Sequence, residues 1–176
     1  MRIMDMKTNL KSIIKTVLAF LVAGSLAGAP GPARADTADA ANAAKVKEAL
    51  TVMKAEALKL GEPKADKVAL YFGTTKMNGN YTIVDELQTR FSCTATFFVK
   101  KGDNYIRIST NVLNDGNRAV GTVLNPQGPA YAAIAKGEAY YGKVDILGQP
   151  YEAGYEPVKD TAGETVGVYY VGYLMQ

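Results

Sequence analysis

The chain has 176 residues, of which 20 are basic, 17 are acidic and 11 are tyrosine, and it contains one cysteine and no histidine. Without histidine it cannot build a Ser-His-Asp or Cys-His catalytic site, and it lacks the commonest metal ligand and the usual general base at neutral pH. The single cysteine, Cys93, excludes an internal disulfide. We expect Cys93 to be a small buried hydrophobe, with a reactive thiol or an intermolecular bridge as the alternative.

Residues 1–35 predict a secretory signal peptide. Basic residues precede an apolar stretch over residues 16–29, and Ala33-Arg34-Ala35 then supplies a small-residue cleavage site. The apolar stretch is shorter than the roughly 20 residues of a membrane-spanning helix, which favours cleavage between Ala35 and Asp36 over an uncleaved anchor. We therefore expect an exported, periplasmic protein.

Removal of this segment changes the charge of the protein. Five basic residues and one acidic residue lie in the first 35, which leaves 15 basic and 16 acidic residues, a net charge of −1, in the remaining 141. This part of the chain offers no basic stripe for a phosphate backbone, so we expect no nucleic-acid partner. Its length is that of one ordinary domain with a hydrophobic core.

Residues 36–62 predict one long amphipathic helix. Asp36 and Thr37 can cap its start, and Gly61 and Pro63 can end it. Apolar residues recur between them at spacings of three and four, which is typical of a helix with one buried face. This stripe consists of Val46, Leu50, Met53, Ala57 and Leu60. A second copy of the chain could also pair with such a narrow seam, so a homodimer is an open alternative.

The pattern shortens from Val68 onward and predicts strands with one helical insertion that opens at Pro129. The apolar, β-branched or aromatic runs are residues 68–71, 81–84, 94–100, 105–111, 119–124, 140–147, 151–158 and 165–173. Short turns join successive runs, which makes neighbouring strands antiparallel. An antiparallel sheet with the long helix on one face gives an α+β domain.

Arg107 is the strongest single candidate for a functional residue. In its predicted strand, Ile106 and Ile108 face one way, while Tyr105, Arg107 and Ser109 face the other. A guanidinium inside an otherwise apolar strand is costly without an anionic partner, which could be a ligand or an internal carboxylate. Seven of the 11 tyrosines follow in the last 37 residues and predict a tyrosine-lined face.

Two catalytic interpretations are weaker. Residues 137–143 match the spacing of a phosphate-binding loop, but Val144 stands where that loop needs Ser or Thr for magnesium. Scattered carboxylates, at Asp145, Glu152, Glu156 and Asp160, could serve a glycosidase only if two met across strands. A solvated sheet face is the ordinary explanation for them. We expect no enzyme, no metal site and no cofactor.

Several ordered blocks of the sequence together resemble a known family. They are Phe97-Phe98-Val99, Tyr105-Ile106-Arg107-Ile108-Ser109-Thr110-Asn111, Arg118-Ala119-Val120-Gly121-Thr122, Gly137-Glu138-Ala139-Tyr140-Tyr141-Gly142, Gly154-Tyr155-Glu156-Pro157-Val158 and Val166-Gly167-Val168. The chain resembles the extracytoplasmic Cache sensor domains, in the fused type-three/type-two single-Cache subgroup of chemoreceptors and sensor kinases. The likeness extends from about Val68 to Tyr173.

The resemblance implies a PAS-like fold for residues 63–176, with the helix of residues 36–62 against a central antiparallel sheet. It also implies a small-molecule pocket over the other face, and ligands that are often small carboxylates. By similarity, the candidates to line this pocket are Arg107, Tyr140, Lys143 and Tyr155. An arginine with tyrosine hydroxyls suits a carboxylate, through an ion pair supported by neutral hydrogen bonds.

The chain ends at Gln176, shortly after the last predicted strand, and shows no second membrane helix or signalling module. We therefore expect a free-standing periplasmic sensor that binds a small anionic metabolite and signals through a separate membrane receptor or sensor kinase. The alternative is an adaptor module without a ligand, which dimerises or docks through its N-terminal helix. A carboxylate-based hydrolase is a third interpretation, which the missing histidine and metal motifs disfavour.

Overall fold

A computed structural model describes residues 34–175, with side chains from Ala41 onward. The predicted signal peptide lies outside the described residues except for its last two positions, which begin helix α1. The three helices are α1 (Arg34–Leu58), α2 (Thr82–Phe91) and α3 (Pro129–Ala135). None of the helices in the described range carries an apolar stretch long enough to cross a bilayer.

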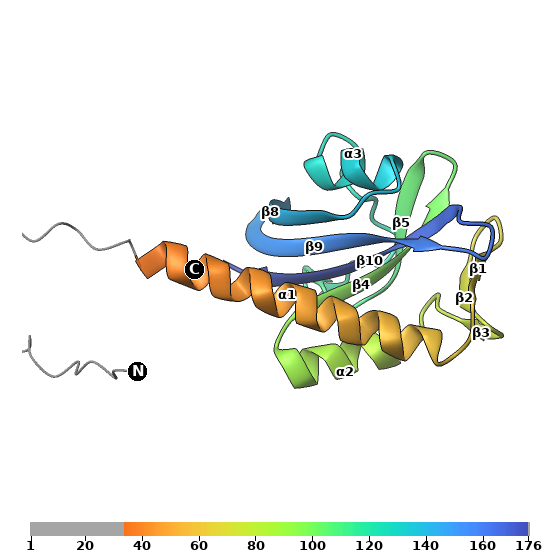
Figure 1. The fold of residues 1–176 in the computed structure, drawn as a ribbon, viewed down its shortest axis with the longest axis horizontal. Coiled ribbons are helices and arrows are strands. Elements are labelled where there is room, and N and C mark those ends of the chain that lie inside the picture. Colours follow the sequence, from red (N-terminus) through yellow and green to blue (C-terminus); the bar gives the residue numbers. More distant parts are fainter. Residues whose placement is uncertain (1–33, 176) are drawn as a thin grey trace, which may run out of the picture. The chain divides into compact units, whose positions relative to one another are not determined.

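The central sheet consists of five antiparallel strands in the order β5-β4-β10-β9-β8 (Figure 1). Their bounds are β4 (Thr94–Lys101), β5 (Asn104–Thr110), β8 (Tyr140–Ile146), β9 (Gln149–Lys159) and β10 (Thr165–Leu174). Hairpins join β4 to β5, β8 to β9 and β9 to β10, and the last strand pairs with β4 in the middle of the sheet. This arrangement confirms the predicted α+β, PAS-like architecture.

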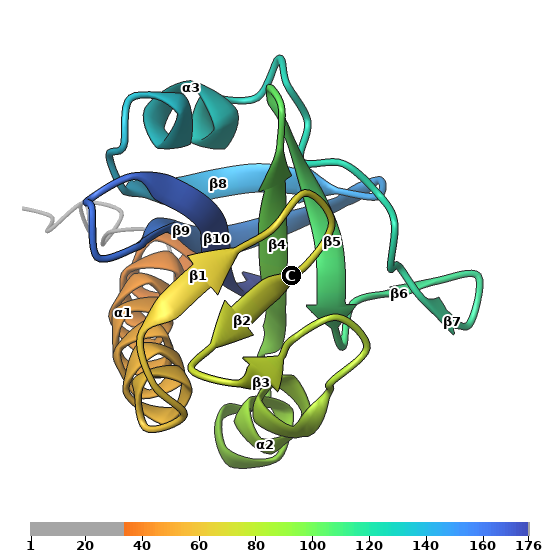
Figure 2. The same ribbon diagram turned by 90° about the vertical axis from the view of Figure 1, so that its right-hand side faces the viewer.

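Two smaller groups of strands flank the sheet (Figure 2). One is a three-stranded sheet of β1 (Pro63–Ala65), β2 (Leu70–Phe72) and β3 (Thr75–Lys76), and the other is a hairpin of β6 (Leu113–Asn114) and β7 (Asn117–Arg118). Arg118 ties this hairpin to α2 through two hydrogen bonds, of 2.8 and 2.9 Å, to the Asp85 carboxylate.

The central sheet is covered on both faces (Figure 1). Helices α1 and α2 pack on one face, which we call the helix face. Helix α3 and the segment of residues 119–128 cover the other, which we call the cavity face. Each face has its own hydrophobic cluster, so residues that alternate along a strand contribute to two different cores.

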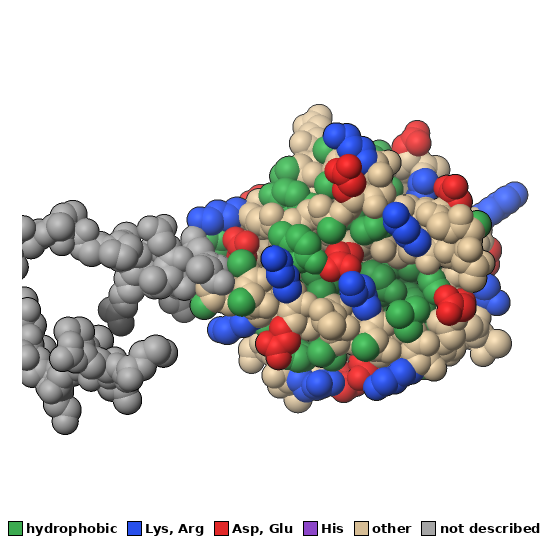
Figure 3. Space-filling model, in the orientation of Figure 1, with side chains coloured by type: hydrophobic (Ala, Val, Ile, Leu, Met, Phe, Trp, Pro, Cys, Tyr) green, Lys and Arg blue, Asp and Glu red, His purple; other side chains and the backbone are tan. Residues whose placement is uncertain are grey.

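The molecular surface in Figure 3 shows acidic and basic side chains interspersed, with small apolar areas between them. No continuous basic stripe crosses that face of the described residues. The distribution agrees with the near-neutral charge expected after removal of residues 1–35, and that view offers no surface suited to a nucleic-acid backbone.

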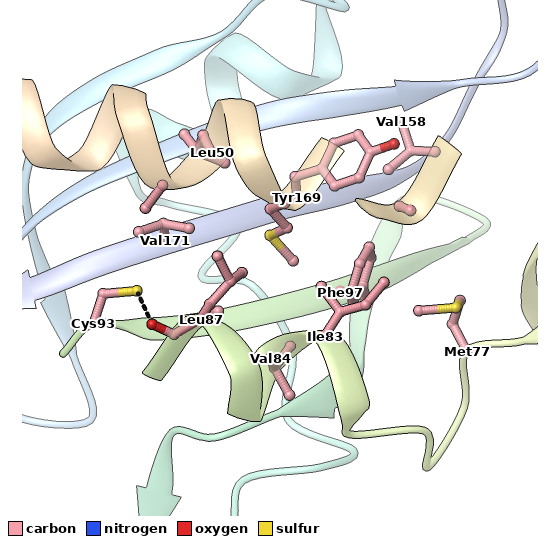
Figure 4. Packing of buried hydrophobic residues seen from close by; sticks show 14 of the residues in the cluster. Leu50, Met77, Ile83, Val84, Leu87, Cys93, Phe97, Val158, Tyr169 and Val171 are labelled. Carbon is pink, nitrogen blue, oxygen red and sulfur yellow. Dashed lines mark hydrogen bonds between the residues drawn. The ribbon is translucent and has the colours of Figure 1, made fainter. Parts of the chain in front are cut away.

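The predicted apolar stripe of α1 is buried against the sheet. Val46, Leu50, Met53 and Ala57 are at most 1% exposed, and they join α2 and the strands in the helix-face core (Figure 4). The helix ends at Leu58, earlier than residue 62, and Leu60 is 39% exposed. Leu60 therefore lies beyond the helix and does not extend the stripe. Its place in the loop follows from the positive φ of Gly61, 123°, which the α-helix does not accommodate.

Helix α2 was missed by the sequence prediction, which placed the run of residues 81–84 among strands. The buried side chains of α2 are Ile83, Val84 and Leu87, which share one side of a helix. Two β-branched residues in succession imitate a strand locally, but contacts with α1 and β4 decide the outcome. The helix ends at Ser92, which has a left-handed φ of 53° and donates its backbone N–H to Gln88.

A β-bulge in β5 interrupts the alternation of that strand, so the prediction that Arg107 and Ser109 face the same way is wrong. Phe98 lies opposite Arg107, but Phe97 lies opposite Ser109, so one residue of β5 is unpaired. Ser109 consequently turns to the helix face, where its hydroxyl donates to the Asn80 carbonyl. The next apolar run, residues 119–124, makes a single β-bridge, between Ile106 and Val123, rather than a strand.

Candidate ligand-binding site

A cavity of about 340 Å³ opens on the cavity face, between the sheet, the start of α3 and the segment before it. Its walls come from four separate parts of the chain: β5, β9, the end of β8 with its turn, and residues 123–130. The lining residues are Arg107, Val123, Leu124, Asn125, Gly128, Pro129, Ala130, Val144, Asp145, Ile146, Leu147 and Tyr155. Its volume lies at the lower end of the range usual for small-molecule sites.

Arg107 is the cationic residue that lines this cavity. It is 5% exposed, and its guanidinium lies 5.1 Å from the centre of the Phe98 ring, directly across the ladder. Its Nη1 donates to the Thr122 hydroxyl, which in turn donates to the Ala119 carbonyl at 2.8 Å. Its Nε is buried and has no hydrogen-bond partner among the described residues. Thr122 therefore fixes one nitrogen of the guanidinium, Nη1, while a second nitrogen, Nε, lacks a hydrogen-bond partner.

No carboxylate neutralises Arg107 within the part of the chain that the structure describes. The ion pairs found there include Lys54–Glu156, Lys59–Glu56, Arg90–Glu86 and Arg118–Asp85, and Arg107 belongs to none of them. Burial lowers the pKa of Arg107 from its ordinary value, and Tyr155 and Tyr170 partly oppose this shift. A guanidinium nevertheless stays charged in proteins. Of the two partners that the sequence left open, the geometry favours a ligand over an internal carboxylate.

Two tyrosines accompany the guanidinium. Tyr155 is 3% exposed, lines the cavity and packs its ring 4.9 Å from that of the fully buried Tyr170. The Tyr170 hydroxyl lies 2.9 Å from the Thr94 hydroxyl. Burial raises the pKa values of the Tyr155 and Tyr170 phenols well above the ordinary value for tyrosine. Both therefore remain neutral at physiological pH, and Tyr155 can donate a hydrogen bond to an anion.

Tyr140 lies beside this group without lining the cavity. Its ring is 6.4 Å from that of Tyr155, directly across the β8–β9 ladder, and its hydroxyl donates to the Lys143 carbonyl at 3.0 Å. Tyr140 therefore supports the ring of Tyr155, and its hydroxyl is already engaged with the main chain.

The structure places Lys143 away from the other three candidates. Lys143 pairs with Glu152 of β9, and Glu152 pairs with Tyr173 of β10. Since Tyr173 belongs to the helix-face core, the side chain of Lys143 also lies on the helix face. Residues 140 and 143 are three apart on one strand, so their side chains leave opposite faces of the sheet. Strand alternation alone could have separated these two candidates.

The comparison with protein families agrees with the observed fold. The model of the Cache 3/Cache 2 fusion domain matches residues 33–176. The chain belongs to this family. A search of curated proteins found no match.

Membership confirms the predicted single-Cache sensor domain. Cache domains are extracytoplasmic sensor modules that bind small molecules and function with membrane receptors, and they are not catalytic. The matched residues include α1, the whole central sheet and every residue that lines the cavity. In this Cache domain, the cavity on the side of the sheet opposite α1 is the candidate ligand site.

The scattered carboxylates of this Cache domain do not converge on a reaction centre. Glu156 lies on the helix face, where it binds Lys54 at 2.5 Å and accepts a hydrogen bond from Tyr141. Asp160 accepts two turn N–H groups, each at 3.0 Å. Asp145 lines the cavity, and no cluster of acidic, cysteine or histidine side chains suited to a metal ion occurs among the described residues.

Thr122 is a site residue that the sequence did not reveal. It lies in an irregular segment that follows the edge of β5, where Arg107 donates its backbone N–H to the Thr122 carbonyl at 2.9 Å. The same segment supplies Val123 and Leu124 to the cavity wall. A short apolar run after a turn carries no signal for such a position, because the contact depends on the fold of the whole edge.

Proposed function

We propose that this Cache domain is a periplasmic sensor that binds a small carboxylate-type metabolite in the Arg107 cavity and signals through a separate membrane partner. One observation carries the proposal: the buried guanidinium of Arg107, a residue that lines the cavity, has an unsatisfied Nε and no carboxylate partner in the described chain. Burial of an unpaired charge costs several kcal/mol, and an anionic ligand would remove much of that cost.

The hydrogen bonds of Arg107 favour a particular binding geometry. Thr122 engages Nη1, while Nε is unsatisfied. The edge formed by Nε and Nη2 presents two parallel N–H groups, which match the two oxygens of a carboxylate. The neutral Tyr155 hydroxyl can add a third hydrogen bond from the wall of the cavity. A carboxylate bound in this way would be recognised by shape as well as by charge.

Strand β9 offers a short connection from this site to α1. Tyr155 lines the cavity on one face, and the next residue, Glu156, binds Lys54 of α1 on the other. Gly154, just before them, contacts Leu50 and Val46 closely enough to leave no room for a Cβ atom. A ligand that prefers one arrangement of β9 would therefore bias the position of α1, and a membrane partner could detect the change.

Two further observations support the proposed location. The basic and apolar segments within residues 1–35 match the pattern of an export signal, and the family is extracytoplasmic. The adaptor alternative, which docks through α1 without a ligand, finds less support. The apolar residues of α1 from Val46 to Ala57 already pack on the sheet. A partner that docked on α1 would therefore meet the outer surface of the helix, which is mostly polar over this range.

The experiment is a thermal-shift screen of the purified protein against small organic acids, amino acids and amines. The proposal predicts a saturable rise in Tm with an acid, because a ligand that binds only the native state stabilises it. Arg107→Met should abolish the rise, and Arg90→Met, which removes the same charge from an exposed pair, should preserve it. A stable protein that responds to no acid would reject the anion sensor in favour of the adaptor.

A further inference from the structure

The cavity holds one positive charge and a largely aliphatic wall. Arg107 is the one cationic side chain among the residues that line it. Aliphatic side chains make up most of the rest, from the segment before α3, from α3 itself and from the end of β8. They are Val123, Leu124, Pro129, Ala130, Val144, Ile146 and Leu147. The site can therefore pair one anionic group and offers apolar contact to whatever is attached to it.

A second negative charge on the ligand would find no cationic partner among these residues. Asp145 is the other charged residue in the wall, and its Oδ1 accepts the Gly148 N–H at 3.0 Å, which holds the carboxylate in the β8–β9 turn. A second ligand carboxylate would thus meet aliphatic side chains, the neutral amide of Asn125 or an acidic residue. Removing such a charge from water without a partner is strongly unfavourable.

The β8–β9 turn itself contains an unusual residue. Leu147 and Gly148 connect the two strands with φ values of 54° and 83°. Two-residue hairpins of this kind favour Asn-Gly, because asparagine tolerates a positive φ far better than leucine does. Leu147 is also 45% exposed, so burial in the core does not explain the choice. Leu147 is one of the residues that line the cavity, where it adds to the aliphatic part of the wall.

From these observations we infer that the ligand of the Arg107 cavity is a monoanion with a short aliphatic tail, and that Leu147 is a specificity residue that contacts this tail. The inference rests on the proposed function and narrows it, since it selects among carboxylates by the number of charges and by the character of the remainder. A dicarboxylate of equal length is rejected by the same cavity.

The test is isothermal titration of the purified protein with three probes of similar size: butyrate, succinate and butyramide. Butyrate should bind with one-to-one stoichiometry. Succinate replaces the terminal methyl with a second carboxylate and should bind at least about tenfold more weakly. Butyramide keeps the tail but lacks the charge and should also lose at least about tenfold.

Leu147→Asn tests the role of the turn residue separately. Asparagine suits the positive φ, so the Tm of the free protein should stay level or rise, while the affinity for butyrate should fall about fourfold or more through lost apolar contact. Leu113→Asn, at an exposed leucine in β6 away from the cavity, is the control and should leave butyrate binding unchanged.

The outcomes separate the inference from the proposed function. Succinate that binds as tightly as butyrate, with both lost in Arg107→Met, would overturn the monoanion inference and leave the carboxylate sensor intact. Binding of neither acid would overturn the monoanion inference, and the proposed function would fall with it only if no acid in the thermal-shift screen stabilises the protein. Unchanged butyrate affinity in Leu147→Asn would remove Leu147 from the site.

Discussion

On the helix face of the sheet, the buried part of the Glu156 carboxylate meets Lys54 and Tyr141, whereas on the cavity face the guanidinium of Arg107 meets no carboxylate in the described chain. The helix face carries a hydrophobic core built from α1, α2 and the strands, and the cavity face contains the hollow of about 340 Å³ that Arg107 and Tyr155 line. One face thus satisfies its charge internally, and the other leaves its charge without a counterion in the described chain. The difference separates the face that packs the helices from the face to which we assign the ligand.

The largest effect should follow from replacing the unpaired charge. Arg107→Met should weaken binding of an anionic ligand by at least about 100-fold, because a buried ion pair loses one partner. The Tm of the free protein should stay level or rise, since the wild type buries this guanidinium without a counterion. Titration and thermal unfolding of the same variant measure both quantities. A large fall in the Tm of the free protein would mean that Arg107 stabilises the fold like its counterparts on the helix face.

The packed face should respond most strongly to added volume. A Cβ atom at Gly154 would lie 2.6 Å from Leu50 and 2.7 Å from Val46, both fully buried on α1. Gly154→Ala should therefore lower the free energy of unfolding by about 2 kcal/mol, as measured by urea denaturation. In a Leu50→Ala background, which removes the closer neighbour, the same substitution should cost less. Additive losses in the double variant would show that α1 does not press on β9 at this point.

The buried thiol of Cys93 should make the stability of the helix-face core depend on pH. Burial raises the pKa of its thiol from 9.0 to about 11, so the native state holds the proton more tightly than the unfolded chain. This contribution to stability is fully present below pH 9 and is lost as pH rises through 11. The loss in the free energy of unfolding should amount to about 2 kcal/mol at pH 11. Urea denaturation across this range should therefore show a steeper decline for the wild type than for Cys93→Ala. Equal slopes would indicate that the thiol is accessible to water.

The smallest effect on stability should come from the ion pair between the two layers. The Lys54 and Glu156 side chains are 37% and 18% exposed, so Lys54→Met should cost less than about 1 kcal/mol. Its consequence should appear instead in hydrogen exchange: a ligand should slow exchange in α1 of the wild type but less so in the variant. Lys59→Met is the matched control, because Lys59 pairs with Glu56 and does not bridge to the sheet. The same ligand response in all three proteins would argue against transmission through Glu156.

The sequence was sufficient for elements whose patterns are local. The stripe from Val46 to Ala57 predicts α1, and the turn residues between apolar runs predict the antiparallel hairpins. It failed at α2, where Ile83 and Val84 favour a strand locally but contacts with α1 and β4 stabilise a helix. It also failed at Ser109, because the bulge in β5 shifts the register by one residue without a marker such as glycine.

The residues of the candidate site also fall into two groups, those that the sequence could predict and those that it could not. A lone arginine in an apolar strand and a tyrosine three strands away in the sheet could be selected from residue chemistry alone, and the structure brings Arg107 and Tyr155 to one cavity. Thr122 and Leu147 could not be selected, since an irregular edge segment places one and a tight turn places the other. Contacts between distant segments fix such positions, and they leave no periodic trace in the sequence.

The most direct test of the anion site is the NMR signal of the Arg107 Nε–H group, assigned by comparison with Arg107→Lys and followed during titration with butyrate. The free protein leaves this group without a hydrogen-bond partner, and a bound carboxylate should accept from it. We predict a saturable downfield shift and slower exchange of this proton with solvent. Saturable binding of butyrate that leaves the Arg107 signal unchanged would contradict the account.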